Sequence, residues 1–351
     1  MIPTTLQIVW FVLWGVLWTV YFMLDGFVLG SGFMSAFLAK SDVEKRQVIN
    51  SVGPVWDGNE VWLLTAGGAT FAAFPTTYAM MFSNLYLALF LLLSALIFRG
   101  VSFEFRGKVD GQGWKKFWDV VMVVSSFVPA LLFGVAFGNI FEGLPMKNDF
   151  AAATFAYQGS FFGLLNPYAL VTGVFFVLLF AVHGSLYTAI KTDGELQQRA
   201  KAMAKRLWWP LLVVAVAFLV YSAFATHLWD NYLSVPVLFV LPLAAVVALL
   251  LVFIFTTKGS LAAAMASSLV TVATVVATGV AGLFPALIPS SLDPASNLTI
   301  MNSSSSPYTL GIMTVVAFVI VPIIIGYKIW VYHLFRAPVT AAEVGAGQQP
   351  Y

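Results

Sequence analysis

Long stretches without a charged residue are the feature that most constrains this chain. Residues 61–98, for example, contain no Asp, Glu, Lys or Arg. About 20 such residues, folded as a helix, cross the hydrocarbon core of a membrane. Charged residues make up only 9% of the chain and hydrophobic residues 60%, whereas a soluble protein carries about 25% charged residues. The polar surface is too small for a soluble globule, and we expect an integral membrane protein.

The apolar stretches predict helices. A transmembrane β-barrel would show segments of about ten residues that alternate between apolar and polar, and the sequence has no such pattern. Only helices and closed barrels satisfy the backbone inside lipid, so the expected fold is an all-α bundle. The chain has no cysteine, which excludes disulfides, iron–sulfur clusters and thiolate-bound metals.

Nine segments have the length and polarity of membrane spans. They cover residues 8–36, 58–74, 78–98, 118–138, 160–189, 207–226, 234–256, 262–288 and 308–334. We expect one membrane domain over residues 1–336, with helices 1–4 within 8–138, helices 5–8 within 160–288 and helix 9 at 308–334. The first span has no basic residue before it and reads as a retained helix. Residues 337–351 have the composition of a disordered cytoplasmic tail.

These spans place the basic residues on one side of the membrane. Of the 17 Lys and Arg residues, only Lys147 falls on the other side. The rest are Lys40, Lys45, Arg46, Arg99, Arg106, Lys108, Lys115, Lys116, Lys191, Arg199, Lys201, Lys205, Arg206, Lys258, Lys328 and Arg336. Because cytoplasmic loops carry an excess of Lys and Arg, we expect the N-terminus outside and the C-terminus in the cytoplasm.

An acid-rich tetrapeptide, Asp57-Gly58-Asn59-Glu60, stands at the cytoplasmic start of the second span. One interpretation is a helix start, in which Asp57 is the N-cap and Glu60 completes a capping box. A cap needs only one polar side chain, however, and this segment offers three, next to Trp56. Small residues follow and favour close helix packing. We therefore expect the second span to lie at the centre of the bundle, and we expect the polar residues at its cytoplasmic end to face protein.

Three further charges lie toward the same side of the membrane. Asp25 is late in the first span, Arg99 closes the third and Asp119 opens the fourth. Ionisable residues in a membrane bundle are costly, and they mark ion or proton routes or structural ion pairs. An Arg99 ion pair with one of the acids and a functional role for that acid are both compatible with the sequence.

Histidines give little support for a metal or haem site. His183 is the only histidine in the interior of a span, since His333 lies at the end of the last one, and it has no matched partner there. We therefore expect no metal site and no cofactor held by this chain alone, and an enzyme that needs such a group would find it in a partner.

The segment GPVWDGNEVWLLTAGGATFAAFP, residues 53–75, resembles the signature of subunit II of cytochrome bd-type quinol oxidases. Further stretches match in the same order along nearly the whole chain, with a weaker middle from about residue 207 to 260. They are LDGFVLGSG, FRGVSFEFRGK, WDVVMVVSSFVPALLFGVAFGN, LNPYALVTG and PSSLDPASNLTIMNSSSSPYTLGIMT.

The resemblance implies a nine-helix subunit of the bacterial cytoplasmic membrane, built from two four-helix bundles and one peripheral helix. It implies a similarly folded partner, subunit I, that holds two haems b and one haem d. Such a complex oxidises quinol and reduces dioxygen to water with cytoplasmic protons. The family also implies that small single-helix subunits and a structural quinone are possible, and it implies no nucleic acid.

The resemblance also implies roles for individual residues. Asp25, Asp57, Arg99 and Asp119 match family positions, and Asp57, with Asp25, is expected on a proton path toward the partner's haem. Burial raises the pKa of a carboxyl group toward neutral pH, which suits such a role. Trp56, Asn59, Glu60, Arg99 and Asp119 are expected to form a supporting polar cluster. One departure is Val28, which follows Asp25-Gly26-Phe27 where the family usually has a second Asp.

Two other function classes remain compatible with the spans. A secondary transporter or ion channel would permit nine helices and a polar cluster, but transporters favour inverted repeats and broken helices at mid-membrane. In this sequence the polar cluster lies at the cytoplasmic end of the spans and not at mid-membrane. A scaffold for subunit I without a proton role is the third interpretation.

Overall fold

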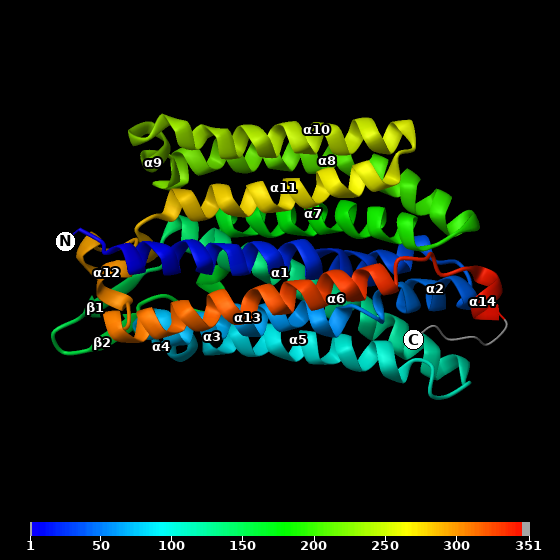
Figure 1. The fold of residues 1–351 in the computed structure, drawn as a ribbon, viewed down its shortest axis with the longest axis horizontal. Helices are drawn as coiled ribbons and strands as arrows, with labels where there is room; N and C mark the ends of the chain where they lie inside the picture. The colour runs from blue at the N-terminus through cyan, green and yellow to red at the C-terminus, as the bar shows by residue number, and fades with distance from the viewer. Residues whose placement is uncertain (1, 346–351) are drawn as a thin grey trace.

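The computed structural model describes residues 2–345. Helices dominate it (Figure 1). Their bounds are α1 (Thr5–Leu38), α2 (Asp42–Val52), α3 (Trp56–Ala73), α4 (Pro75–Asn84), α5 (Tyr86–Phe105), α6 (Gln112–Glu142), α7 (Pro167–Lys191), α8 (Gly194–Ala225), α9 (Leu228–Ser234), α10 (Val240–Lys258), α11 (Leu261–Leu283), α12 (Ile300–Ser303), α13 (Pro307–Leu334) and α14 (Ala341–Gly345). Two short antiparallel pairs complete the fold, β1 (Met146–Asp149) with β2 (Thr154–Tyr157) and β3 (Ala286–Ile288) with β4 (Leu298–Thr299).

Eight helices in the described part of the chain are long and apolar enough to cross a membrane. They are α1, α5, α6, α7, α8, the stretch Pro236–Lys258 that contains α10, α11 and α13. The predicted second span forms α3 but is not among the eight, because 18 residues that include Asp57, Asn59 and Glu60 have a lower mean hydropathy. The count of nine spans is therefore a proposal.

The helices depart from several of the predicted spans. The span expected over 78–98 is split between α4 and α5, which meet at Leu85. The helix expected from residue 160 begins at Pro167, where Asn166 caps it by accepting a hydrogen bond from the Ala169 amide. The span expected to end at 288 stops at Leu283, and residues 286–288 form strand β3.

The long helices run side by side, and their contacts sort them into two groups (Figure 1). One group contains α7, α8, α10 and α11, and the other contains α1, α3, α5 and α6, while α13 runs along the outside of α1 and α3. The two groups meet mainly where α7 packs against α1 and α6. Aromatic rings fill this junction: the Phe22 ring centroid lies 5.3 Å from those of Phe133 and Phe176 in edge-on contact, a favoured arrangement for buried aromatic pairs.

Two glycines allow the closest helix approach in the core. Gly30 of α1 lies against the Phe180 carbonyl of α7, and Gly184 of α7 lies against the backbone of Gly30 and Ser31. A Cβ atom at either glycine would overlap backbone atoms of the other helix. The α1–α7 crossing therefore requires a residue without a side chain on both helices.

The connecting segments gather at two ends. The N-terminus, α12 and the β1–β2 hairpin lie at one end, and α2 and α14 lie at the other (Figure 1). The C-terminal segment docks at the α2 end: the Val339 amide donates to the Lys191 carbonyl at 2.8 Å, and Lys191 Nζ donates to the Ala337 carbonyl at 2.7 Å. Residues 337–345 are thus packed on the bundle, so the prediction of disorder is wrong for them. The tail's last residues, 346–351, lie outside the described part of the chain.

We expect Gly30→Ala to destabilise the protein. The added methyl group would overlap the Phe180 carbonyl, and overpacking of a tight core costs about 1–3 kcal/mol. Thermal unfolding of the purified protein in detergent measures the loss. Gly113→Ala on α6 is the matched control, because nothing lies within 4 Å of its added Cβ and alanine favours a helix over glycine. Equal unfolding temperatures for the two variants would contradict the tight crossing.

Candidate functional site

A buried arginine links three helices of the first group. Arg99 of α5 has no exposed side-chain surface, and its Nη1 lies 2.8 Å from Oδ2 of Asp25 on α1, which is equally buried. Its Nη2 lies 3.1 Å from Oε2 of Glu60 on α3, whose side chain is 19% exposed. The ion pair allowed by the sequence is therefore present, and it has two carboxylates.

Asp25 and Arg99 each leave one polar atom without a partner among the described residues. Oδ1 of Asp25 and Nε of Arg99 are buried and form no hydrogen bond with other described residues. Buried polar groups in proteins are almost always satisfied, by protein or by ordered water. The environment of Asp25 and Arg99 thus calls for water between α1, α3 and α5.

Asp57 does not cap its helix. The N-cap of α3 is Val55, which gives no side-chain hydrogen bond, and Asp57 sits in the first turn. The capping interpretation is therefore wrong, although an acid in a first turn still suits the positive end of the helix dipole. Asp57 is exposed in this chain, whereas Asn59 is fully buried and donates to the Leu24 carbonyl at 2.9 Å.

The exposed side of Asp57 continues along α3. Buried residues lie on one side of this helix: Asn59, Trp62, Ala66, Thr70 and Ala73. Exposed residues lie on the other: Asp57, Val61, Leu64, Gly68 and Phe71. Within this chain α3 is therefore not enclosed by other helices: it packs on α1 and more lightly on α13, and its other side is open.

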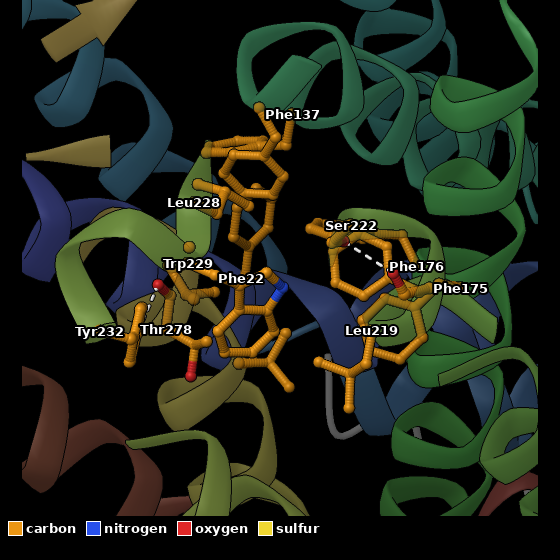
Figure 2. Close-up of a pocket in the computed structure, with 15 residues that line it drawn as sticks. Phe22, Phe137, Phe175, Phe176, Leu219, Ser222, Leu228, Trp229, Tyr232 and Thr278 are labelled. Atoms are coloured by element: carbon orange, nitrogen blue, oxygen red, sulfur yellow. Dashed lines mark hydrogen bonds between the residues drawn. The ribbon is translucent and has the colours of Figure 1, made fainter. Parts of the chain in front are cut away.

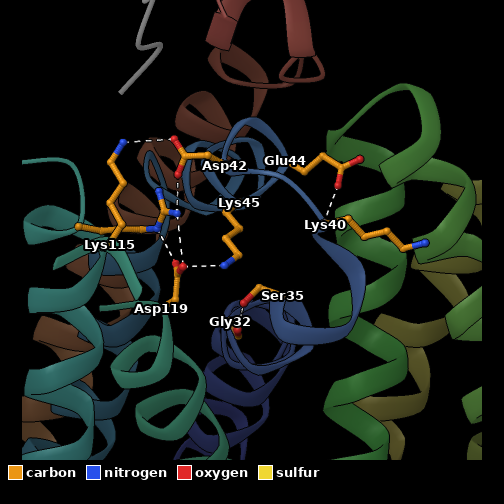
Figure 3. A network of polar contacts seen from close by, with 9 residues as sticks. Gly32, Ser35, Lys40, Asp42, Glu44, Lys45, Lys115 and Asp119 are labelled. Atoms are coloured by element: carbon orange, nitrogen blue, oxygen red, sulfur yellow. Dashed lines mark hydrogen bonds and ion pairs between the residues drawn. The ribbon is translucent and has the colours of Figure 1, made fainter. Parts of the chain in front are cut away.

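Asp119 belongs to a second, separate network. It accepts from Arg106 Nε at 2.5 Å and from Lys45 Nζ at 2.6 Å (Figure 3). Arg106 also bonds Asp42 of α2 at 2.7 Å, and Asp42 lies 3.4 Å from Lys115 Nζ. This network ties α2 to α5 and α6 at the α2 end. The expected single cluster is therefore two clusters, and Asp119 is outside the Asp25–Arg99–Glu60 group.

Trp56 supports the start of α3. Its ring lies over Gly100 of α5, where a Cβ would come within 2.9 Å, and its centroid is 5.7 Å from that of Phe103. This contact holds the first turn of α3 against α5, one residue from Arg99.

Sequence reasoning missed two neighbours of the site, both on α13. The Tyr332 hydroxyl donates to Oδ1 of Asn59 at 2.8 Å, and Lys328 Nζ lies directly against Gly58. Lys328 and Tyr332 are polar residues in an otherwise apolar helix, which is the sequence feature that could have pointed to them. The sequence does not show, however, which helix α13 packs against.

Val28 lies in an apolar, fully buried environment. It is fully buried and packs in a cluster that includes Phe27, Val52, Phe103 and Met122. A carboxylate there would be surrounded by apolar side chains, so the absence of the family's usual second acid matches its surroundings in this chain.

His183 is held by both ring nitrogens. Nδ1 lies 2.8 Å from the Ser268 hydroxyl and Nε2 lies 2.9 Å from the Met23 carbonyl. Neither nitrogen is placed to bind a metal or haem. The described residues also contain no group of three or more His, Cys, Asp and Glu side chains that could hold a metal ion.

An aromatic cavity is lined by residues of α1, α6, α7, α8, α9 and α11 (Figure 2). Phe22, Phe137, Phe175, Phe176 and Trp229 contribute to its wall. The hydroxyls of Ser222 and Tyr232 are engaged with Tyr168 and the Thr278 carbonyl, whereas the Trp229 N–H has no partner among the described residues.

We expect Asp25→Asn to destabilise the protein, because it leaves the buried Arg99 charge with only the partly exposed Glu60. Breaking a buried ion pair costs about 3–5 kcal/mol. Asp25→Asn with Arg99→Gln should recover part of the loss, and the exposed Asp110→Asn is the control. Thermal unfolding in detergent is the measurement, and a double variant less stable than both single variants would refute the pairing.

The carboxyl groups of α2 predict acid sensitivity: Asp42 belongs to the second network, and Glu44 pairs separately with Arg199. Partial burial disfavours ionised Asp42 and Glu44, but their hydrogen bonds and the nearby charges of Arg106 and Arg199 outweigh it and lower the pKa of both carboxyls. A carboxyl with a lowered folded pKa stabilises the protein above its unfolded pKa and loses that effect as pH falls through the folded value. Stability should therefore drop below the ordinary values of 3.8 and 4.5. Asp42→Asn should flatten this drop in unfolding scans against pH, and an unchanged slope would argue against the network.

Comparison with known proteins gives a consistent result. The family described as cytochrome bd terminal oxidase subunit II matches residues 6–335. The chain is 36% identical over 369 residues to cytochrome bd-I ubiquinol oxidase subunit 2 of Escherichia coli strain K12, covering 97% of this chain and 96% of that protein. It is 37% identical over 341 residues to cytochrome bd ubiquinol oxidase subunit 2 of Bacillus subtilis strain 168, covering 97% and 98%.

A solved structure agrees on the fold. A chain in the structure of bd oxidase from Geobacillus thermodenitrificans superposes with a TM-score of 0.77 at 16% identity, covering 95% of this chain and 99% of that chain. The apolar helices and the relatives together indicate a multi-pass protein of the bacterial inner membrane. The chain belongs to the cytochrome bd terminal oxidase subunit II family.

Proposed function

We propose that this chain is the haem-free subunit II of a bd-type terminal oxidase, which oxidises quinol and reduces dioxygen to water. It joins a haem-bearing subunit I, supports the assembly of that subunit and contributes a cytoplasmic route for proton uptake. The observation that carries this proposal is the family membership over nearly the whole chain. The same membership disfavours a transporter or channel.

The exposed side of α3 supports a partner. An ionised side chain such as Asp57 is costly against lipid, yet it shares this side with Val61, Leu64 and Gly68. We take α3 as the ninth span, with this side covered by subunit I. The small Gly67 and Gly68, which have nothing within 4 Å of a hypothetical Cβ, would let a partner helix approach closely.

The proton route begins at Asp57. Glu60 lies one turn further along α3, so the two side chains are neighbours on the helix, and Glu60 contacts Arg99. Asp25 is held by Arg99 and has one oxygen free for water. Asp57 thus exchanges the proton at the surface, Glu60 receives it, and the Asp25–Arg99 pair holds water between the helices.

The remaining polar residues position this route. Asn59 fixes α3 through Leu24 and Tyr332, and Trp56 fixes its first turn against α5. Asp119 anchors the cytoplasmic ends of α2, α5 and α6 through Arg106 and Lys45. The haems, which supply the electron transfer and oxygen chemistry, belong to the partner in this proposal, because His183 is engaged by both nitrogens.

We expect Asp57→Asn to slow quinol oxidation severalfold while the complex keeps its haem content, because an amide cannot carry the exchanged proton. Oxygen uptake per haem in purified membranes is the measurement. Glu195→Gln is the control, since Glu195 is an exposed acid at the start of α8 near the same end of the bundle. Normal uptake by Asp57→Asn at normal haem content would leave the chain a scaffold without a required proton role.

The partner is tested by purification through a tag on this chain. A larger membrane protein that carries haem d should accompany it, and the isolated chain should be colourless. A haem spectrum from this chain alone would overturn the assignment of the haems to subunit I.

A further inference from the structure

One charged side chain projects from the membrane helix α13. Lys328 is the only Asp, Glu, Lys or Arg in Pro307–Leu334, and it stands six residues before the end of the helix, a distance of about 9 Å along its axis. Ionisable residues within a membrane bundle are costly, and they pair with another charge or serve an ion or proton route. Lys328 is thus expected to have a charged partner or a functional role.

The ammonium group of Lys328 lies on the first turn of α3. Its Nζ is so close to Gly58 that a Cβ atom at that residue would overlap it. Asp57, which precedes Gly58, is the acid whose charge acts on Lys328. The two side chains form no direct ion pair in the described part of the chain. The Asp57 carboxylate therefore has a cation nearby and still keeps its exposed oxygens for proton exchange.

The other surroundings of Lys328 offer it no counter-charge. The residue borders an apolar groove beside α13, of which about 1190 Å³ is free of protein atoms, part of it open to the surroundings. None of the described residues that line this groove is acidic. The hydroxyls of Tyr187 and Tyr332, which also line it, already donate to the Ser51 carbonyl and to Asn59. This leaves Asp57 as the negative charge that this chain provides for Lys328.

The backbone of α3 does not favour a cation at this place. The first turn of a helix carries a partial positive charge, which repels a cation, and Val55 at the N-cap gives no side-chain hydrogen bond to the free amides. The flexible stem of a lysine near a helix end can carry the ammonium to the aqueous surface instead. The Asp57 carboxylate offsets the repulsion at Gly58, so the two charges stabilise each other at the start of α3.

We propose that Lys328 is a positioning residue of the proton entrance, whose positive charge stabilises the Asp57 carboxylate that accepts a proton from the cytoplasm. Two other charged groups lie nearby: Glu60 is a like charge on the same helix, and Arg99 of α5 is engaged by Glu60 and Asp25. Lys328 is thus the cation left for Asp57 among the described residues. This inference rests on the proton role proposed for Asp57, and it adds that α13 takes part in the entrance.

The test is the pH profile of oxygen uptake per haem, measured on the whole complex in purified membranes. We expect Lys328→Gln to move the acid limb of the profile to higher pH by about one unit, because a carboxylate that loses a nearby opposite charge takes up a proton more readily. Lys328→Arg keeps the charge and should restore the wild-type profile, since the open groove has room for the larger side chain. Lys258→Gln, an exposed lysine outside the groove, is the matched control.

A second variant moves the ammonium group without removing it. Gly58→Ala places a methyl group where Nζ of Lys328 now lies, so it should displace the lysine and shift the profile in the same direction. Gly326→Ala on α13 is its control, because nothing lies within 4 Å of the added Cβ atom. Gly58→Ala also tests the proposal if Lys328→Gln fails to assemble.

The possible outcomes separate this inference from the proton role itself. A wild-type profile for Lys328→Gln, while Asp57→Asn is slow, would overturn the inference and leave the proton role intact. Equal shifts in Lys328→Gln and Lys328→Arg would also overturn it, since the effect would then follow side-chain shape and not charge. In an Asp57→Asn background, Lys328→Gln should have no further effect, and an additional shift would contradict an action through Asp57. Normal uptake by both single variants would remove the proton role and the inference together.

Discussion

The Arg99 charge is the constraint on which the rest of this structure depends. A guanidinium without exposed surface inside a membrane bundle requires negative partners and hydrogen-bond acceptors at short distance. Asp25 and Glu60 meet that requirement from two other helices, so the ion pairs fix the relative positions of α1, α3 and α5. The fixed position of α3 in turn presents Asp57 on the side that this chain leaves open.

The need of Arg99 for negative partners also gives Asp25 and Asp57 different surroundings. Asp25 is committed to Arg99, whereas Asp57, one helical turn from Glu60, has an exposed side chain. A carboxylate that exchanges protons needs access to water, and a carboxylate that holds a buried cation must stay in place. The two acids proposed for the proton route therefore have different environments in this chain: Asp25 is buried against Arg99, and Asp57 is exposed.

Much of the fold was predictable because membrane helices are governed by local composition. The apolar stretches located most of the helices, and the sequence order placed Asp25, Glu60 and Arg99 toward the same face of the membrane. The predictions that failed concern features that depend on tertiary packing. The break at Leu85, the early stop of α11 at Leu283 and the docking of residues 337–345 depend on contacts with distant segments, such as Val339 with Lys191. Asp119 was grouped with Asp25 because both lie near the same membrane face. The sequence does not reveal that Asp119 forms its ion pairs with Arg106 and Lys45.

The sequence by itself determined the membrane class, the likeness to one oxidase family and the side on which the basic residues gather, because these follow from residue types and their order. Only the tertiary structure decided which charges pair, which side of α3 is open and where α13 leaves a groove. Pairing and exposure depend on the rotation and crossing of helices. Close approaches such as Gly30 against Gly184 set these rotations through contacts between residues more than 150 positions apart.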